Sequence, residues 1–380
     1  MQMALKLARK GVIRQSGRAR GGAVLVVEGK PTGYGQTNAA VGQPAALVAL
    51  PEGRPSDPGA TLYTNIEPCL DTEQPDEYLS RFMELAPKHI VVGVQSPTGR
   101  DASSQILSRL ASSGVTIETG VCEEECLQVN EVYYKYQRSG MPFVTIKFAA
   151  SLDGRIATST GDSQWISSPG SLRFAHELRR EHQAVLVGIG TALADDPQLT
   201  VRLVKGPNPI RVVADTSLRI PVNARVLLDC QTQQTIIATT EDADLSRVSA
   251  LERLGAEVLV LPRAPRIGLQ ADASGRQTGE HPDRYGVDLS RLIAALGERN
   301  IASLLVEGGS GIITSLLASR SVDRIVSVIA PKIIGTGIEA IGDLGIKHLR
   351  NAITFSSVKT GRLGRDVVFD GRVCWASGTV

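Results

Sequence analysis

Short apolar runs alternate with amphipathic stretches along most of this chain. The spacing of apolar residues predicts an amphipathic helix over residues 1–10. In the rest of the first part, the pattern predicts strands at 22–27, 61–64, 89–94 and 115–118, and helices at 44–50, 77–85 and 104–112. A glycine-rich stretch through Gly33, Gly35 and Gly42 follows the first strand. A compact sheet covered by helices is the packing that buries these apolar faces.

Residues 123–138 have the pattern of one connecting helix, with acidic side chains at its N-terminal end, where the helix dipole favours them. The turn and helix-breaking residues at 139–142 end this helix. A chain of 380 residues is too long for one ordinary core, since a domain takes roughly 150 residues. We therefore predict two domains, residues 1–140 and 141–380.

The second part alternates between strands and helices more regularly. The pattern predicts strands at 143–148, 184–187, 210–214, 235–238, 257–261, 303–306 and 325–329, and helices at 169–182, 245–254, 289–297 and 311–318. In the helix predicted over residues 169–182, Ser168 is suited to the N-cap and Pro169 to the first helical position. This alternation favours a mostly parallel sheet with helices on both faces. Residues 262–285 are expected to form an exposed loop without chemistry, in which His281 is solvated.

Composition narrows the classes of function. The chain is 42% hydrophobic and 21% charged, as expected of a compact α/β protein. Its 41 basic and 39 acidic residues give a net charge of +2, so the basic footprint of a nucleic-acid-binding protein is missing. No apolar stretch approaches the roughly 18 residues that span a bilayer, and the first residues lack a signal-peptide pattern. Five scattered cysteines fit a reducing compartment, so we expect a cytoplasmic protein.

Residues 61–69 end in a Glu-Pro-Cys sequence whose last residue is Cys69. They resemble the strand and helix start of the pyrimidine deaminase domain of riboflavin biosynthesis, which implies a cytidine-deaminase-like fold. Catalysis of this kind needs three His or Cys ligands for zinc and a Glu that transfers protons. This chain has Pro44 and Ala46 where the family has the His and Glu, and Tyr78 where it has the second cysteine. We therefore expect no zinc, a buried Cys69 and a lost deaminase activity.

A longer resemblance covers the second part. Residues 143–157, 161–167, 187–202 and 305–311 follow one another as in the reductase half of the bifunctional riboflavin biosynthesis deaminase/reductase family. The resemblance implies a dihydrofolate-reductase-like α/β fold for this part. The turns at 188–191 and 307–311 each follow a strand and precede a helix, where backbone N–H groups can meet a phosphate. Neither turn is the six-position Rossmann fingerprint, which agrees with the implied fold.

The resemblance also implies the site residues. For NADPH they are Ala149, Trp165, Thr191, Asp195, Thr216, Gly309, Ser310, Gly311, Ile312, Ile313, Thr314 and Ser315. For the substrate they are Ser163, Arg179, Leu199, Arg202 and Glu307. The two arginines suit a ribose 5-phosphate, which a guanidinium binds through forked, charge-assisted hydrogen bonds.

The implied reaction is NADPH-dependent reduction of the ribose of 5-amino-6-(5-phosphoribosylamino)uracil, by hydride delivery to C1' of the opened sugar. The candidate catalytic residues are Lys147, Asp195 and Glu307, and the sequence does not single out the proton donor. No fingerprint for the 2'-phosphate of NADPH is recognisable. The family implies a homo-oligomer, and the lost deaminase implies a separate deaminase in the same pathway.

Two other functions stay open at this point. One is reduction of a related phosphoribosylated heterocycle, because the altered first domain weakens the link to standard riboflavin synthesis. The other is a non-catalytic nucleotide-binding protein that assembles with a separate deaminase. The presence of Lys147, Asp195 and Glu307 beside both glycine turns favours an enzyme.

Overall fold

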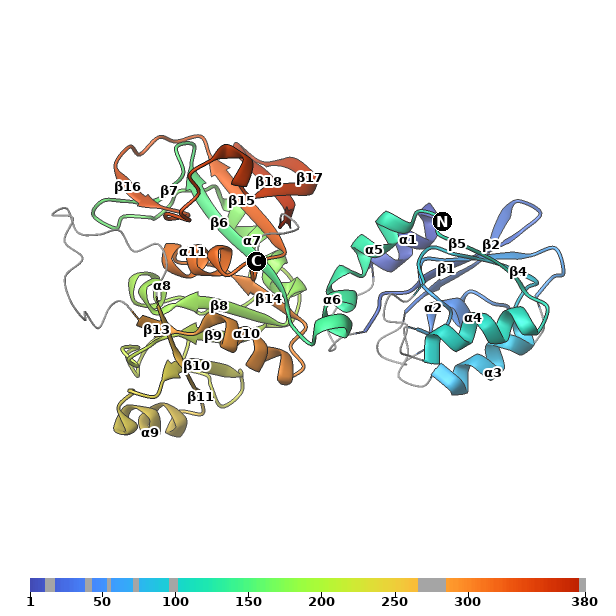
Figure 1. The fold of residues 1–380 in the computed structure, drawn as a ribbon, viewed down its shortest axis with the longest axis horizontal. Coiled ribbons are helices and arrows are strands. Elements are labelled where there is room, and N and C mark those ends of the chain that lie inside the picture. The colour runs from blue at the N-terminus through green and yellow to red at the C-terminus, as the bar shows by residue number, and fades with distance from the viewer. Residues whose placement is uncertain are drawn as a thin grey trace. The chain divides into compact units, whose positions relative to one another are not determined.

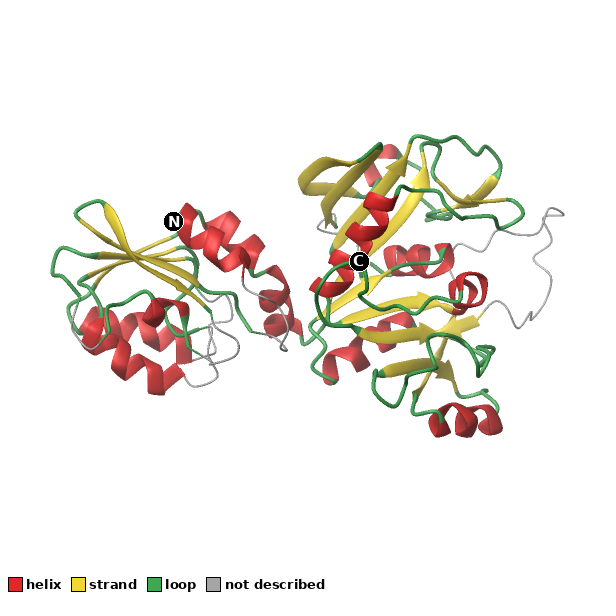
Figure 2. Cartoon of the chain, turned by 180° about the vertical axis from the view of Figure 1, so that it is seen from behind, coloured by secondary structure: helices red, strands yellow, loops and turns green. Residues whose placement is uncertain are grey.

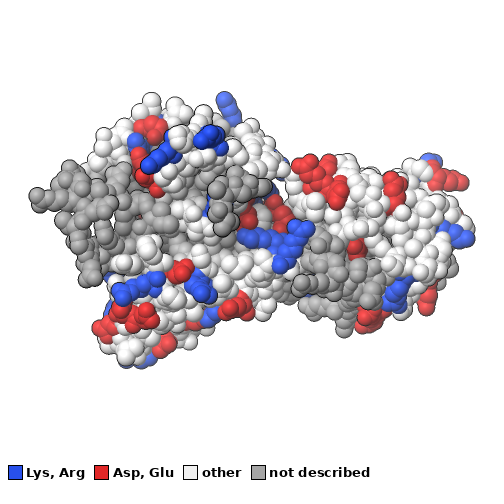
Figure 3. Space-filling view, in the orientation of Figure 1, with Lys and Arg blue, Asp and Glu red and all other residues white. Residues whose placement is uncertain are grey.

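The computed structural model describes residues 1–10, 18–37, 43–52, 56–70, 75–95, 102–265 and 285–375. These residues form two compact units, Met1–Gly140 and Met141–Val380, and each unit is a sheet with helices on both faces (Figures 1 and 2). Acidic and basic side chains are interspersed on the face of each unit in Figure 3, in keeping with the net charge of +2. Within the described ranges, none of the helices combines the length and the apolar character that crossing a bilayer requires.

The first unit has a five-stranded sheet in the order β2-β1-β3-β4-β5. Strand β1 is antiparallel to β2 and β3, whereas β3, β4 and β5 are parallel. Its strands are β1 (Gly22–Val27), β2 (Lys30–Gln36), β3 (Thr61–Thr64), β4 (His89–Val92) and β5 (Thr116–Thr119). Its helices are α1 (Gln2–Lys10), α2 (Ala45–Val48), α3 (Pro75–Leu85), α4 (Ala102–Ser112), α5 (Glu123–Val129) and α6 (Glu131–Ser139). Helices α2, α3 and α4 cover one face, and α1 and α5 cover the other (Figure 1).

Strand β2 occupies most of the stretch that the sequence marked only as glycine-rich. Gly33 and Gly35 face α2 so closely that a Cβ at either position would overlap the backbone carbonyl of Ala49 or Ala45. Because these two glycines have no side chain, β2 can lie directly against the backbone of α2. Gly42, from the same stretch, lies outside the described residues.

The single connecting helix predicted over residues 123–138 is wrong, because the segment is two helices. Helix α5 ends and α6 begins at Asn130, whose backbone leaves the helical region at φ −114° and ψ 18°. The side chain of Asn130 accepts a hydrogen bond from the Arg20 backbone N–H at 2.6 Å and donates one to the Arg20 carbonyl at 3.1 Å. This long-range pairing fixes the break, and the local pattern could not reveal it.

The second unit has a nine-stranded sheet in the order β11-β10-β9-β8-β14-β6-β15-β18-β17. The strands from β11 to β15 are parallel, as predicted, and the last two are antiparallel. They are β6 (Phe143–Ser151), β8 (Ala184–Gly188), β9 (Ile210–Ala214), β10 (Thr235–Thr240), β11 (Glu257–Leu261), β14 (Ser303–Val306), β15 (Arg324–Ala330), β17 (Thr354–Leu363) and β18 (Asp366–Cys374).

Two aliphatic cores sandwich this sheet. Helices α10 (Leu289–Glu298) and α11 (Ser310–Ala318) contribute to the core on one face. Helices α7 (Pro169–Glu181), α8 (Ile189–Asp195) and α9 (Leu245–Arg253) contribute to the core on the other. The sequence had predicted helices on both faces, and the structure has them.

Other elements differ from the sequence analysis. The hairpin of β17 and β18 and the small sheet of β7 (Arg155–Thr158) and β16 (Gly337–Glu339) were not predicted. The predicted loop over residues 262–285 begins in β12 (Arg263–Pro265) and runs into β13 (Tyr285–Val287), which pair with each other. His281 and the centre of that loop lie outside the described residues. Ser168 stands at the N-cap of α7 but its hydroxyl donates to the Leu363 carbonyl at 3.1 Å instead of capping the helix.

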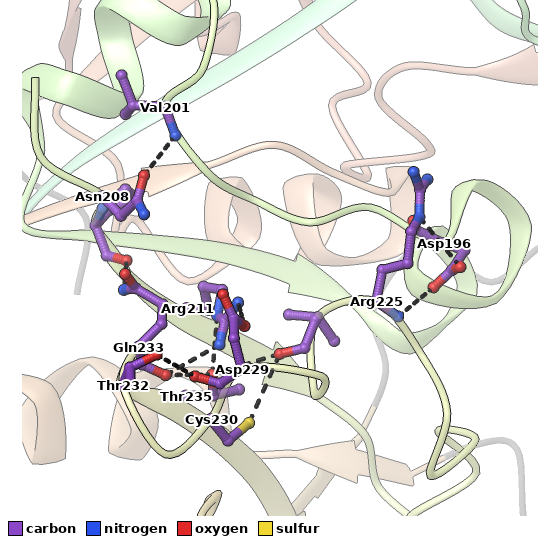
Figure 4. Close-up of polar contacts among 12 residues, drawn as sticks. Asp196, Val201, Asn208, Arg211, Arg225, Asp229, Cys230, Thr232, Gln233 and Thr235 are labelled. Atoms are coloured by element: carbon purple, nitrogen blue, oxygen red, sulfur yellow. Dashed lines mark hydrogen bonds and ion pairs between the residues drawn. The ribbon is translucent and has the colours of Figure 1, made fainter. Parts of the chain in front are cut away.

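A fully buried arginine ties β9 to the segment before β10. Arg211 donates hydrogen bonds to Asp229 Oδ1 at 2.5 Å, to Thr235 Oγ1 at 2.8 Å and to the Gln233 carbonyl at 3.0 Å (Figure 4). Its charge is buried, but each of the three guanidinium nitrogens donates a hydrogen bond and one of them pairs with a carboxylate, which stabilises a buried cation. These contacts fix the amino end of β9.

Candidate active site

The second unit contains a cavity of about 860 Å³. Residues of four neighbouring strands line it: Lys147 and Ala149 of β6, Gly188 at the end of β8, Ala214 at the end of β9, and Glu307 directly after β14. These strands are parallel, so their carboxyl ends meet at one edge of the sheet. The fold thus brings together side chains that are 160 positions apart in the sequence.

Most of the site residues that the resemblance implied line this cavity. They are Lys147, Ala149, Ser163, Trp165, Arg179, Thr191, Asp195, Arg202, Thr216, Glu307, Gly309, Ser310, Gly311, Ile312, Ile313 and Ser315. Leu199 and Thr314 do not line it. Leu199 is 1% exposed in the core between sheet and helices, and the hydroxyl of Thr314 donates to the Ser310 carbonyl within α11.

An ion pair between Arg179 and Glu307 joins α7 to the end of β14. Arg179 Nε donates to Glu307 Oε1 and Nη2 to Oε2, each at 2.6 Å, and the two side chains are only 12% and 10% exposed. Burial alone would raise the pKa of Glu307, but the charge and hydrogen bonds of Arg179 and the charge of Lys147 outweigh it and lower that pKa. Glu307 is therefore an ionised carboxylate in this site.

Lys147 lies beside this pair. Within the described ranges its ammonium group makes no hydrogen bond and no ion pair. Burial lowers the pKa of Lys147, the nearby carboxylate of Glu307 opposes that shift, and the charge of Arg179 adds to it. A lysine with a lowered pKa gives up its proton more readily than an ordinary lysine does.

His176 is a residue that the sequence analysis missed. It is 4% exposed, lines the cavity, and its Nδ1 accepts a hydrogen bond from the Arg202 backbone N–H at 3.1 Å. Burial, and then the positive charges of Arg179 and Arg202, lower the pKa of His176 to about 4. The ring is therefore neutral at pH 7 and holds the segment that carries Arg202. Its position one helical turn before Arg179 was the signal available in the sequence.

Two glycine turns form the middle of the cavity. Gly188 donates its backbone N–H to the Gly308 carbonyl at 3.0 Å, which joins the ends of β8 and β14. Gly309 is the N-cap of α11, and a Cβ there would come to 3.2 Å from Thr191 Oγ1. The first N–H groups of α11 have no partner within the helix and line the cavity at Ser310 and Gly311. This arrangement can bind a phosphate through backbone donors.

Asp195, the last residue of α8, and Trp165 also line the cavity. Burial raises the pKa of Asp195, and a hydrogen bond from Gln164 opposes the shift. The Trp165 side chain is 64% exposed, and its carbonyl accepts a hydrogen bond from Lys332 Nζ at 2.6 Å. Arg225 approaches from the loop after β9 and pairs with Asp196 at 3.2 Å (Figure 4).

In the first unit, the positions that correspond to zinc ligands lie in an apolar cluster. Cys69 and Ala46 are 0% and 2% exposed in one hydrophobic core, against which Tyr78 packs. Pro44 is buried at the N-cap of α2. In the described part of the chain, no three His, Cys, Asp or Glu side chains are grouped as a metal site would need. The residues present do not fit a catalytic zinc.

Comparisons with known proteins show the class of the second unit and the family of the whole chain. Residues 142–369 match the family described as the RibD C-terminal domain, so the second unit is a dihydrofolate-reductase-like α/β domain of the riboflavin-pathway reductases. The riboflavin biosynthesis protein RibD of Aquifex aeolicus is 35% identical over 369 residues, which cover 97% of this chain and 96% of that protein. The RibD of Escherichia coli is 31% identical, with coverage of 97% and 96%. The chain belongs to the RibD family of riboflavin biosynthesis proteins.

A solved structure is similar to this chain over nearly its whole length. It is that of a diaminohydroxyphosphoribosylaminopyrimidine deaminase/5-amino-6-(5-phosphoribosylamino)uracil reductase from Thermotoga maritima. It is 28% identical in sequence and superposes with a TM-score of 0.74, covering 98% of this chain and 97% of that one. Acinetobacter baumannii RibD has the same fold, with a TM-score of 0.78.

The energetic coupling between Arg179 and Glu307 can be measured without any ligand. We expect Arg179→Met to lower the free energy of unfolding of the second unit by about 3 kcal/mol, because it leaves a buried carboxylate without its partner. The double variant Arg179→Met/Glu307→Gln should lose at least about 1 kcal/mol less of the free energy of unfolding than the sum of the losses in the two single variants. Urea denaturation of the four proteins measures this. The exposed pair Arg173–Glu177 on the same helix is the matched control and should show a coupling under about 0.5 kcal/mol. Additive effects at the buried pair would contradict this account.

His176 should make the stability of the second unit depend on pH. Because its pKa is about 4 in the folded state, below the ordinary 6.5, the unfolded state takes up the proton first as the pH falls. The free energy of unfolding should therefore fall by about 2 kcal/mol between pH 7.5 and pH 5 through this group alone. His176→Asn keeps an acceptor near the position of Nδ1 and should remove this part of the slope in denaturation curves. His89→Asn, at an exposed position of the first unit, should leave the slope unchanged.

Proposed function

We propose that this protein reduces the ribose of 5-amino-6-(5-phosphoribosylamino)uracil to the ribitylamino product with NADPH, and that its first unit has lost deaminase activity. The observation that carries the proposal is the cavity in which Lys147 and the Arg179–Glu307 pair lie next to two glycine turns. The Thermotoga maritima protein is named for this reductase activity, among others. The three candidate catalytic residues that the resemblance implied, Lys147, Asp195 and Glu307, all line this cavity.

The cavity fits a dinucleotide. Its glycine turns at 188–191 and 308–311 leave room for a pyrophosphate against backbone N–H groups, since side chains at Gly190 or Gly311 would point into open space. Ala149, Trp165, Thr191, Asp195 and Thr216 would hold the rest of the cofactor. When bound, NADPH supplies a hydride to C1' of the ribose in its ring-opened imine form.

Arg202 is the residue we assign to the substrate phosphate. Arg179 already uses three of its five N–H donors, two on Glu307 and one on the Thr200 carbonyl at 3.1 Å, and its charge is offset by the carboxylate. The guanidinium of Arg202 makes no hydrogen bond or ion pair with the residues that the structure describes. His176 fixes its backbone, so a phosphate would meet a positioned arginine.

Lys147 is the residue we assign to proton transfer. When C1' accepts the hydride, the imine nitrogen takes one proton and the C=N bond becomes a single bond. Glu307 is ionised by Arg179 and so has no proton to give, whereas the lowered pKa of Lys147 favours release of a proton from its ammonium group. Glu307 would instead accept hydrogen bonds from ribose hydroxyls and hold the positive charge of Lys147 nearby.

Loss of the deaminase rests on the apolar surroundings of Cys69. With Pro44, Ala46 and Tyr78 in place of two ligands and the general acid/base, neither a zinc-bound water nor a proton shuttle can form. A separate deaminase must then provide the substrate. The family also implies a homo-oligomer.

The function is tested by NADPH consumption with the deaminated substrate, beside its undeaminated 2,5-diamino-pyrimidinone precursor. We expect turnover of the first compound, and no ammonia release from the precursor with or without added zinc. Ammonia release would contradict the loss of the deaminase. Cofactor binding without turnover of either compound would favour a related phosphoribosylated heterocycle or a binding role.

Substitution of Lys147 separates proton transfer from binding. We expect Lys147→Met to lower kcat about 100-fold or more, because it removes the proton donor. Lys147→Arg keeps a positive charge that does not deprotonate, so substrate binding should recover while kcat stays low. In the parent protein kcat should fall as the pH rises through the lowered pKa of Lys147. Steady-state kinetics with a pH profile measures this, and an unchanged kcat in Lys147→Met would remove the residue from the chemistry.

A further inference from the structure

Four arginines line the cavity, and three of them belong to the end where Glu307 lies. They are Arg179, Arg202 and Arg225, and the fourth is Arg219. Arg179 is paired with Glu307, and Arg225 with Asp196 (Figure 4). Partial burial and then the charges of Arg179 and Arg225 lower the pKa of Arg202, which places these three cations near one another.

Arg219 differs from these three. It follows β9, its side chain is exposed, and within the described ranges it makes no hydrogen bond or ion pair. The strands that line the cavity are adjacent in the order β9-β8-β14-β6. At about 4.8 Å per strand, β9 lies roughly 14 Å from β6, on the order of the length of an extended dinucleotide. Arg219 therefore follows the strand that lies farthest from β6 among the four strands that line the cavity.

The loop that carries Arg219 is fixed by long-range hydrogen bonds. The buried carboxylate of Asp215 accepts the Ile220 backbone N–H at 2.8 Å, and Arg247 donates to the carbonyls of Leu218 and Ile220. The carbonyl of Thr216 accepts from the hydroxyls of two β10 threonines at 2.9 and 3.1 Å. Leu218 has a φ of 50°, a conformation held by these contacts. These hydrogen bonds fix the loop that carries Arg219, and none of them involves the side chain of Arg219.

We propose that Arg219 binds the 2'-phosphate of the adenosine ribose of NADPH and sets the preference for NADPH over NADH. The inference rests on the proposed function, because it needs a dinucleotide with its nicotinamide near Lys147. The extra group of NADPH is a phosphate dianion, which a guanidinium binds with forked hydrogen bonds. An enzyme selective for NADH presents a carboxylate to the 2'-hydroxyl instead. Asp288 lines the cavity, but its Oδ1 already accepts two backbone N–H groups at the start of α10, at 2.9 and 3.0 Å.

The test compares binding of NADPH, NADH and adenosine 2',5'-bisphosphate by calorimetry. In Arg219→Ala we expect the dissociation constants of NADPH and the bisphosphate to rise about 10- to 100-fold, the range for a lost charge-assisted hydrogen bond. Binding of NADH should change less than about twofold. Arg219→Lys should recover part of the affinity, because it keeps a positive charge at this position. Arg253→Ala is the matched control, since Arg253 is exposed on α9 and donates only to the Ser249 carbonyl of its own helix.

Three results would overturn the assignment. They are equal affinity of the parent protein for NADPH and NADH, equal weakening of both by Arg219→Ala, and a raised KM for the phosphoribosyl substrate with unchanged NADPH binding. Each of these leaves the proposed reductase in place. Failure of the parent protein to bind any dinucleotide would instead overturn the proposed function.

Discussion

The parallel pairing of β9, β8, β14 and β6 is the constraint on which the site depends. Parallel strands run in one direction, so the residues after each strand gather at the same edge of the sheet. The edge collects Lys147 from one strand, Glu307 from the next and Arg219 from the last. None of these positions is near another in sequence, and the two aliphatic cores that sandwich the sheet keep their spacing. The packing of these two cores therefore fixes the positions of the residues that line the cavity.

Charge at this edge is arranged around the Arg179–Glu307 pair. The pair neutralises itself, which leaves Lys147 and Arg202 as the cations available to a ligand at that end. Burial, and then the charges of Arg179 and Arg202, lower the pKa of His176, so its ring is neutral at pH 7. His176 therefore adds no positive charge beside these two arginines. The proposed phosphorylated sugar would find a cation for its phosphate and a carboxylate for its hydroxyl groups at this end. The opposite end offers Arg219, which suits a second phosphate.

The first unit shows how a sheet covered by helices is stabilised without a metal site among the residues that the structure describes. Its sheet and helices are held by the apolar cluster that includes Cys69 and Ala46, and this cluster needs no metal. A polar ligand set in the same place would have to be desolvated and would be stable only around an ion. Small apolar side chains remove that requirement. The same residues therefore account for both the stability of the unit and its unsuitability for zinc.

The sequence by itself determined the elements whose pattern is local. Strands β1, β3, β9, β11 and β14 begin and end where the apolar runs do, because burial of a strand needs only its own residues to be apolar. The motifs also pointed to Lys147, Glu307 and the glycine turns. Tertiary structure decided what depends on distant partners: β2 exists because Gly33 and Gly35 admit the backbone of α2, and α5 ends because Asn130 binds Arg20. It also decided that Arg179 is paired with Glu307 while Arg219 makes no ion pair with the residues that the structure describes. The pairing of charges follows from proximity in space and leaves no trace in the local sequence.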